Sequence, residues 1–224
     1  MITNAKERAK GVLKNDYLKI LGIVVLFSLI FGFFNTSLPR ILGFTTEKNI
    51  DFMGYSYSLT VNDGTFSTIM SLIVSTISII PLHYFINLVR GTKVTLKESF
   101  DFFIKNFLTI LLVSVIKNVI TSVGYILLII PGLIAELGLC YAFLYLIDNP
   151  DKSFDEIIKS TWNFTKGYKG TILLFALSFI GWYILCLLIL PLLYVAPYFQ
   201  IANVCLYEEI KNTKNVVNEE VVNS

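Results

Sequence analysis

The chain has 224 residues, of which 55% are hydrophobic and only 15% are charged, and its mean hydropathy is +0.70. Soluble domains carry about 25% charged residues, so the composition excludes an ordinary soluble fold as well as disordered and collagen-like chains. The net charge of +2 gives no indication of a nucleic-acid partner. The sequence therefore predicts a protein that crosses a membrane several times.

Two apolar runs in the N-terminal half are long enough for the roughly 20 residues that a membrane-spanning helix needs. The first, residues 17–38, ends without an A-x-A-like cleavage site, so we interpret it as a retained helix and not as a signal peptide. The second covers residues 66–89, with a kink expected at Pro81.

The loop between these runs, about residues 35–65, is the longest in the chain. In it Tyr55, Tyr57, Leu59 and Val61 alternate with small polar residues, which predicts a short strand or hairpin. We interpret the loop as a surface connector, with a cap on the helices or a binding site for an external ligand as the alternatives.

Two further apolar stretches are about twice the length of one span. Residues 106–147 predict a helical hairpin that turns within residues 125–132, because Pro131-Gly132 favours a turn. Residues 170–207 predict a second hairpin that turns within residues 187–192, around Pro191. The total is six membrane-spanning helices in an all-α bundle.

The orientation follows from the basic residues, because cytoplasmic flanks of membrane helices accumulate lysine and arginine. With the N-terminus inside, the inner segments hold fifteen of the 18 basic residues, whereas the outer side keeps only Arg40 and Lys48. Both termini are therefore expected in the cytoplasm.

A three-fold internal repeat is expected, each unit consisting of an amphipathic interfacial helix followed by a hairpin. Each interfacial helix opens on a capping-box pattern: Asn4 with Glu7, Thr95 with Glu98, and Ser153 with Glu156. The units cover about residues 1–90, 91–148 and 149–210, which together form a single membrane domain. A polar cytoplasmic tail, residues 211–224, follows.

The basic interfacial helices are expected to hold the protein on anionic lipid headgroups at the inner face of the membrane, since each basic residue near such a surface contributes about 1 kcal/mol. A docking surface for a protein partner is the alternative. The residues expected to anchor the helices are Lys10, Lys14, Lys97, Lys105, Lys159, Lys166, Lys169 and Trp162.

Polar residues inside apolar spans are candidate site residues, because placing a charge there costs about 2.5 to 3.5 kcal/mol. Lys117 and Glu136 are expected at similar depth in one hairpin, where they form either a structural pair or a polar site for substrate or protons. His83 and Asn87 share one helix face. His83 is interpreted as a packing residue, with a proton relay as the alternative.

No sequence signature of catalysis or of a cofactor is present. The three cysteines lie in apolar runs without C-x-x-C spacing, and the single histidine limits both metal binding and acid-base chemistry. Acidic residues near the predicted helix ends, including Asp148 and Glu208, are interpreted as solvated caps. We therefore expect neither an enzyme nor a metal centre.

The C-terminal half carries an ordered set of motifs, which begins with Tyr145-Leu-Ile-Asp-Asn-Pro150 and Ser153-x-x-Glu156 and ends with Ala196-Pro-Tyr198. With Ile130-Pro-Gly132 and the N-terminal stretch 9–17, these motifs resemble the bacterial integral-membrane family known as domain of unknown function 975. The resemblance covers nearly the whole chain apart from the outer loop and the tail. The resemblance implies a protein of the bacterial cytoplasmic (plasma) membrane and supplies no substrate or catalytic residue.

Two functions are expected from these features. The first is a non-enzymatic accessory or regulatory component of the membrane, with a membrane-protein partner or as a homo-oligomer. The alternative is a small transporter or lipid-handling protein that uses Lys117, Glu136 and His83 in a polar cavity.

Overall fold

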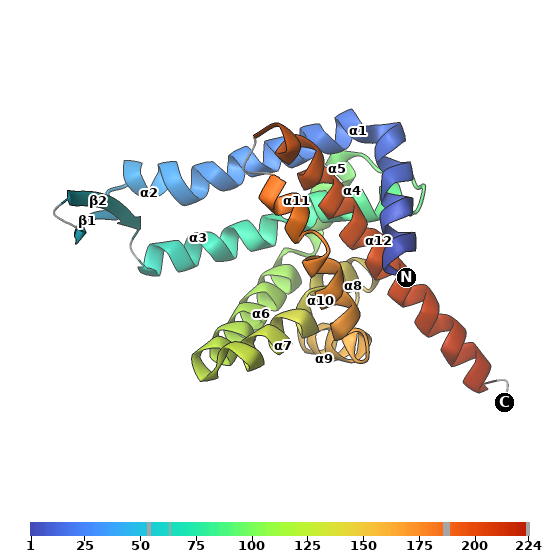
Figure 1. The fold of residues 1–224 in the computed structure, drawn as a ribbon. Helices are drawn as coiled ribbons and strands as arrows, with labels where there is room; N and C mark the ends of the chain where they lie inside the picture. The colour runs from blue at the N-terminus through green and yellow to red at the C-terminus, as the bar shows by residue number, and fades with distance from the viewer. Residues whose placement is uncertain (53–54, 63, 186–188, 223–224) are drawn as a thin grey trace.

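The computed structural model describes residues 1–52, 55–62, 64–185 and 189–222. Over these residues the chain is mainly helical, and long helices extend from a packed centre in several directions (Figure 1). The elements before the second interfacial segment are α1 (Ile2–Gly32), the π-helix η1 (Phe33–Ser37), α2 (Leu38–Ile41), β1 (Thr45–Phe52), β2 (Tyr55–Asn62), α3 (Gly64–Ile77) and α4 (Ile79–Val89). Those that follow are α5 (Leu96–Lys105), α6 (Phe107–Leu127), α7 (Ile129–Leu139), α8 (Ala142–Asp148), α9 (Phe154–Thr165), α10 (Lys169–Leu177), α11 (Ile180–Leu185) and α12 (Ile189–Val222).

In the part of the chain that the structure describes, four helical stretches are long and apolar enough to cross a membrane: Ile2–Gly32, Leu72–Val89, Phe107–Leu127 and Ile129–Asp148. A shorter apolar stretch, Lys169–Trp182, follows them. Lengths and compositions of this kind indicate a membrane protein, in agreement with the composition of the chain.

The long loop at about residues 35–65 contains the β-hairpin that the alternation of its residues predicts. Strands β1 and β2 pair antiparallel, with Thr45 opposite Asn62 and Phe52 opposite Tyr55. The hairpin projects beyond the helices on the side away from the N-terminus (Figure 1). It is the one strand pair in the described part of a chain that is otherwise helical.

The N-terminal helix differs from the prediction at its start. Helix α1 begins at Ile2 with Met1 as its N-cap, so Asn4 lies inside the helix and forms no capping box. The two other predicted boxes are present, at Thr95 with Glu98 and at Ser153 with Glu156. A helix can begin before a capping pattern when the preceding residues are compatible with helical geometry, as Ile2 and Thr3 are here.

Each interfacial segment is separated from the apolar helix that follows by a local break. In α1 the break is Asp16, with φ −125° and ψ 24°, and the helix axis bends there (Figure 1). The equivalent positions are Asn106, with φ −106° and ψ 14°, and Gly167, with φ 85°. Each break lies seven positions after a small residue: Ala9, Ser99 and Ser160, respectively.

Helices α6 and α7 form the predicted hairpin, and the turn is made by Leu128 in an extended conformation. The two helices approach closely because glycines face each other: a Cβ on Gly124 would lie 2.8 Å from Cα of Gly132. Such small-residue contacts are typical of packed membrane helices. The second predicted turn, near Pro191, falls partly on residues 186–188, which lie outside the described residues. Pro191 itself is in the first turn of α12.

Helix α12 forms the centre of the fold and packs against α1 and α4. Its residues Ile201, Ala202 and Leu206 are completely buried. The helix does not stop at the end of the apolar sequence. It continues to Val222, so most of the predicted polar tail is helical and projects from the body next to the N-terminus (Figure 1).

Candidate functional site: an ionic cluster between helix ends

An ionic cluster connects the C-terminal ends of α4 and α8 to α12. Arg90, the C-cap of α4, forms ion pairs of 2.7 Å with Asp148 and 2.5 Å with Glu208. Asp148 is the last residue of α8, whereas Glu208 lies on α12. One guanidinium therefore holds two helices of distant sequence against the end of a third.

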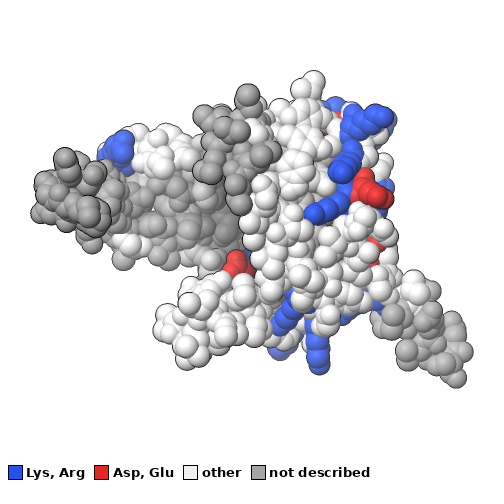
Figure 2. Space-filling model, in the orientation of Figure 1, with Lys and Arg blue, Asp and Glu red and all other residues white. Residues whose placement is uncertain are grey.

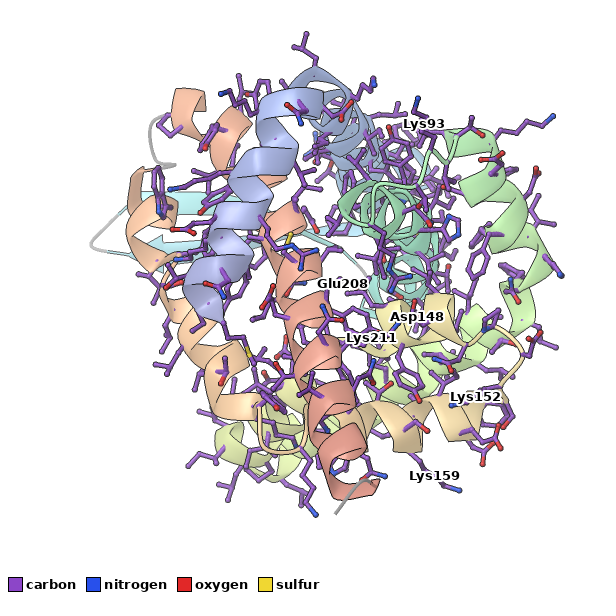
Figure 3. All side chains as sticks on the ribbon, turned by 90° about the vertical axis from the view of Figure 1, so that its right-hand side faces the viewer. Lys93, Asp148, Lys152, Lys159, Glu208 and Lys211 are labelled. Atoms are coloured by element: carbon purple, nitrogen blue, oxygen red, sulfur yellow. The ribbon has the colours of Figure 1, made fainter. Side chains whose placement is uncertain are left out.

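Asp148 is the most connected residue of the cluster. Its Oδ2 atom accepts hydrogen bonds from the Tyr207 hydroxyl at 2.8 Å and from the Lys211 ammonium at 2.5 Å, while Oδ1 faces Arg90. Figure 3 shows Asp148 beside Glu208 and Lys211 on the neighbouring face of α12. The side chain of Asp148 is only 7% exposed, so most of its stabilisation comes from these partners and not from water.

The charges of the cluster balance, since two cations, Arg90 and Lys211, face two carboxylates. Burial lowers the pKa of Arg90, but its hydrogen bonds to Glu208 and Asp148 outweigh this effect, so the pKa lies above its ordinary value. A balanced, mutually hydrogen-bonded cluster can remain charged where solvent is scarce.

The interpretation of Asp148 and Glu208 as solvated caps is therefore wrong, because both side chains are mostly buried and paired with cations. Their role depends on pairing over long sequence separations, which local helix-end chemistry does not reveal. One signal in the sequence is a shared spacing: Arg90, Asp148 and Glu208 each lie five residues before a hydroxyl residue, Thr95, Ser153 and Thr213.

Aromatic side chains surround the cluster on the α8 and α9 side. The ring of Tyr207 lies 5.4 Å from that of Tyr141 and 5.0 Å from that of Phe164. Tyr141 in turn donates a hydrogen bond to Asn203 on α12 at 3.3 Å. The rings reduce solvent access to the ion pairs and so strengthen them.

The four residues of the predicted intramembrane site are divided between two places. His83 and Asn87 connect α4 to the interfacial helix α5: the His83 ring is 3.1 Å from Ser99 Oγ and stacks on Phe102 at 4.5 Å. The Asn87 amide donates to the His83 carbonyl at 2.8 Å. This arrangement agrees with the packing interpretation of His83.

Lys117 and Glu136 lie on the α6–α7 hairpin, and each has its own partner. The Lys117 ammonium lies 5.4 Å from the centre of the Phe143 ring, while Glu136 accepts a hydrogen bond from the Tyr125 hydroxyl. Among the residues that the structure describes, no ion pair joins Lys117 to Glu136. No hydrogen bond links either of them to His83 within the same part of the chain.

Seven of the eight predicted anchor residues are exposed, namely Lys10, Lys14, Lys97, Lys105, Lys159, Lys166 and Trp162. Lysine and arginine gather along the right and lower edges of the molecule in Figure 2, whereas this face of the α6–α7 arm is almost uncharged. Lys159 extends away from the ribbon in Figure 3. Two predicted anchors also contact each other, because the Lys169 ammonium lies 3.3 Å from the centre of the Trp162 ring.

The contacts of the cluster are structural, since they hold α4, α8 and α12 together. Its members hold one another through ion pairs and hydrogen bonds, and none is a nucleophile paired with a general base. Within residues 1–52, 55–62, 64–185 and 189–222, no group of three or more histidine, cysteine, aspartate or glutamate side chains could hold a metal ion.

The fold and the cluster define a helical protein with several helices of membrane-spanning type. Residues 123–214 match the family model described as "Protein of unknown function (DUF975)", which confirms the resemblance over these residues. The matched segment includes Asp148, Glu208 and Lys211 of the cluster. Neither the curated proteins nor the solved structures contain a match to this chain.

Proposed function

We propose that the protein is a non-enzymatic, multi-pass component of a bacterial cytoplasmic membrane, with an accessory or regulatory role toward a membrane-protein partner. The observation that carries the proposal is the cluster of Arg90, Asp148 and Glu208. Each of these residues lies at the end of one proposed repeat unit, and all three meet at one place. If every unit ends on the side of the membrane where it began, each unit must cross the membrane an even number of times.

The geometry around the cluster supports six spans with both termini on the cytoplasmic side. Arg8 near the N-terminus forms a 3.0 Å ion pair with Glu209, next to the cluster. The β-hairpin and the α6–α7 turn extend away from this end (Figure 1). Breaks at Asp16, Asn106 and Gly167, all at equivalent positions, support the three-fold repeat.

The exposed lysines of the interfacial helices support attachment to anionic headgroups on the cytoplasmic side. Lys97 and Lys105 lie on α5 and Lys159 on α9, each on a short helix that begins with a capping box. The same helices carry exposed apolar side chains, such as Phe100 and Trp162. Helices with both kinds of residue lie in the plane of the membrane surface.

The accessory role is tested by native mass spectrometry of the protein, extracted in lipid nanodiscs from its own cells. We expect a protein partner at fixed stoichiometry. A protein that is recovered only as a monomer or homo-oligomer with a defined small molecule contradicts the accessory role and favours transport.

A transport or lipid-handling role is the second candidate, and a cavity of about 440 Å³ between α1, α3, α4 and α12 favours it. Polar groups of Ser75, Ser78 and Gln200 interrupt its apolar lining. Its volume falls in the range of small-molecule sites. Lys117, Glu136 and His83 are absent from this lining, so the cavity is distinct from the polar site that the sequence predicts.

A further inference from the structure

A second cavity, of about 660 Å³, lies between the proposed interfacial helix α5 and the helices α1, α3, α4 and α6. Its lining is apolar apart from Thr76 and Lys97, and it includes Leu26, Ile73, Phe103 and Leu111. The cavity therefore runs from a helix proposed to lie at the membrane surface to apolar residues of four other helices. A groove with this composition excludes polar solutes and favours a hydrocarbon chain.

The position of Lys97 distinguishes this groove from a general apolar surface. Lys97 lies in the first turn of α5, two residues after the N-cap Thr95, and is the one charged residue in the lining. In the described part of the chain no carboxylate lies within ion-pair distance of Lys97. An unpaired cation at the mouth of an apolar groove is complementary to a ligand with one anionic group and a long apolar part.

The surrounding side chains agree with a lipid ligand. Leu96, Phe100 and Phe107 line the groove and are still 38%, 49% and 47% exposed. Exposed apolar residues of a surface helix insert at the level where headgroups meet acyl chains. A bound lipid would cover them further.

We propose that this groove binds one anionic phospholipid, with an acyl chain between α1, α3 and α6 and the phosphate at Lys97. The proposal rests on the membrane location proposed above. It is independent of whether the protein has a protein partner. The site would fix α5 against the N-terminal helices and so couple the fold to the lipid composition of the inner leaflet.

The test is native mass spectrometry of the purified full chain in a mild detergent, titrated with phosphatidylglycerol or with phosphatidylcholine of the same acyl chains. We expect one phosphatidylglycerol to bind at least about fivefold more tightly than phosphatidylcholine, the effect of one charge-assisted contact. The Lys97→Gln variant is expected to lose this preference, whereas Lys97→Arg keeps it. Lys105→Gln is the matched control on the same helix, because Lys105 does not line the groove.

A second variant tests the apolar part of the site. Ile73→Phe adds volume inside the groove, and we expect it to weaken the first binding event of both lipids, with the helix content in circular dichroism unchanged. Equal affinity of the unsubstituted protein for the two lipids overturns the proposal. Equal losses in Lys97→Gln and Lys105→Gln overturn it as well, since they show a general charge effect. Failure of the membrane location is recognised separately, as release of the protein from washed membranes.

Discussion

Arg90 donates two hydrogen bonds to a single oxygen of Glu208, 118 residues further along the chain, from Nε at 3.0 Å and from Nη2 at 2.5 Å. The same guanidinium reaches Asp148 at 2.7 Å. One side chain thus joins the C-terminal ends of α4 and α8 to a residue inside α12, so we expect the arrangement of the proposed units to depend on Arg90.

Replacing Arg90 by methionine leaves the two carboxylates with a single remaining cation, Lys211. Because Asp148 and Glu208 are mostly buried, we expect the variant to lose about 2 to 4 kcal/mol in the free energy of unfolding. Thermal unfolding in detergent, followed by circular dichroism, measures the effect.

The matched control is Arg8→Met, which removes the more exposed pair with Glu209. Exposed ion pairs contribute about 0 to 1 kcal/mol, so this variant is expected to unfold within a few degrees of the unsubstituted protein. Similar losses in the two variants would show that the Arg90 cluster has no special role.

Gly124→Ala tests the close approach of α6 and α7. The added Cβ would lie 2.8 Å from Cα of Gly132, so the helices must separate, and we expect a loss of about 1 to 3 kcal/mol. Gly11→Ala is the control, since no atom lies within 4 Å of a Cβ there, and better helix propensity should stabilise α1 by about 0.5 to 1 kcal/mol. Unfolding curves that move in the same direction for the two variants would contradict the packing described for the hairpin.

Thr95→Ala removes the hydroxyl that accepts from the Glu98 amide at 3.2 Å, and we expect it to cost about 1 kcal/mol. Asn4→Ala should be neutral or slightly stabilising, since Asn4 lies inside α1 and caps nothing. Hydrogen exchange of the first turns of α5 and α1 measures both effects. Faster exchange at the start of α1 in Asn4→Ala would contradict this expectation and would show that Asn4 caps the helix, as the sequence predicts.

Lys117 and Glu136 provide a test by double-mutant cycle. Because each has a separate partner, Phe143 and Tyr125, the effects of Lys117→Met and Glu136→Gln on unfolding should add within about 0.5 kcal/mol. Rescue of the single variant Lys117→Met by the second change would instead show that the two charges form a structural pair.

Local signals predicted much of the fold. The turn before Pro131-Gly132, the helix starts at Thr95 and Ser153, and strand β2 with its alternating Tyr55 and Tyr57 all follow from residues that are close in sequence. The prediction that α1 begins at Asn4 was wrong, because helix formation from Ile2 onward competes with a cap at Asn4.

The ionic cluster could not be predicted in the same way. Its members are far apart in sequence, and an aspartate at the end of a helix, such as Asp148, has the same local sequence whether it faces water or an arginine. Only the burial of α12 between α1 and α4 brings Glu208 to Arg90. Lys97 was predicted as an anchor, but its place at the mouth of a groove depends on helices α1, α3 and α6.

All three units are proposed to return to the cytoplasmic side, and cysteine accessibility in intact cells tests this topology. Single cysteines are placed at Lys10, Lys97 and Lys159 on the proposed inner side and at Arg40 and Leu128 on the outer side, in a chain whose three natural cysteines are replaced by alanine. With a membrane-impermeant maleimide, we predict labelling of positions 40 and 128 in intact cells, and of positions 10, 97 and 159 only after permeabilisation. Labelling of any of positions 10, 97 and 159 in intact cells would contradict the account.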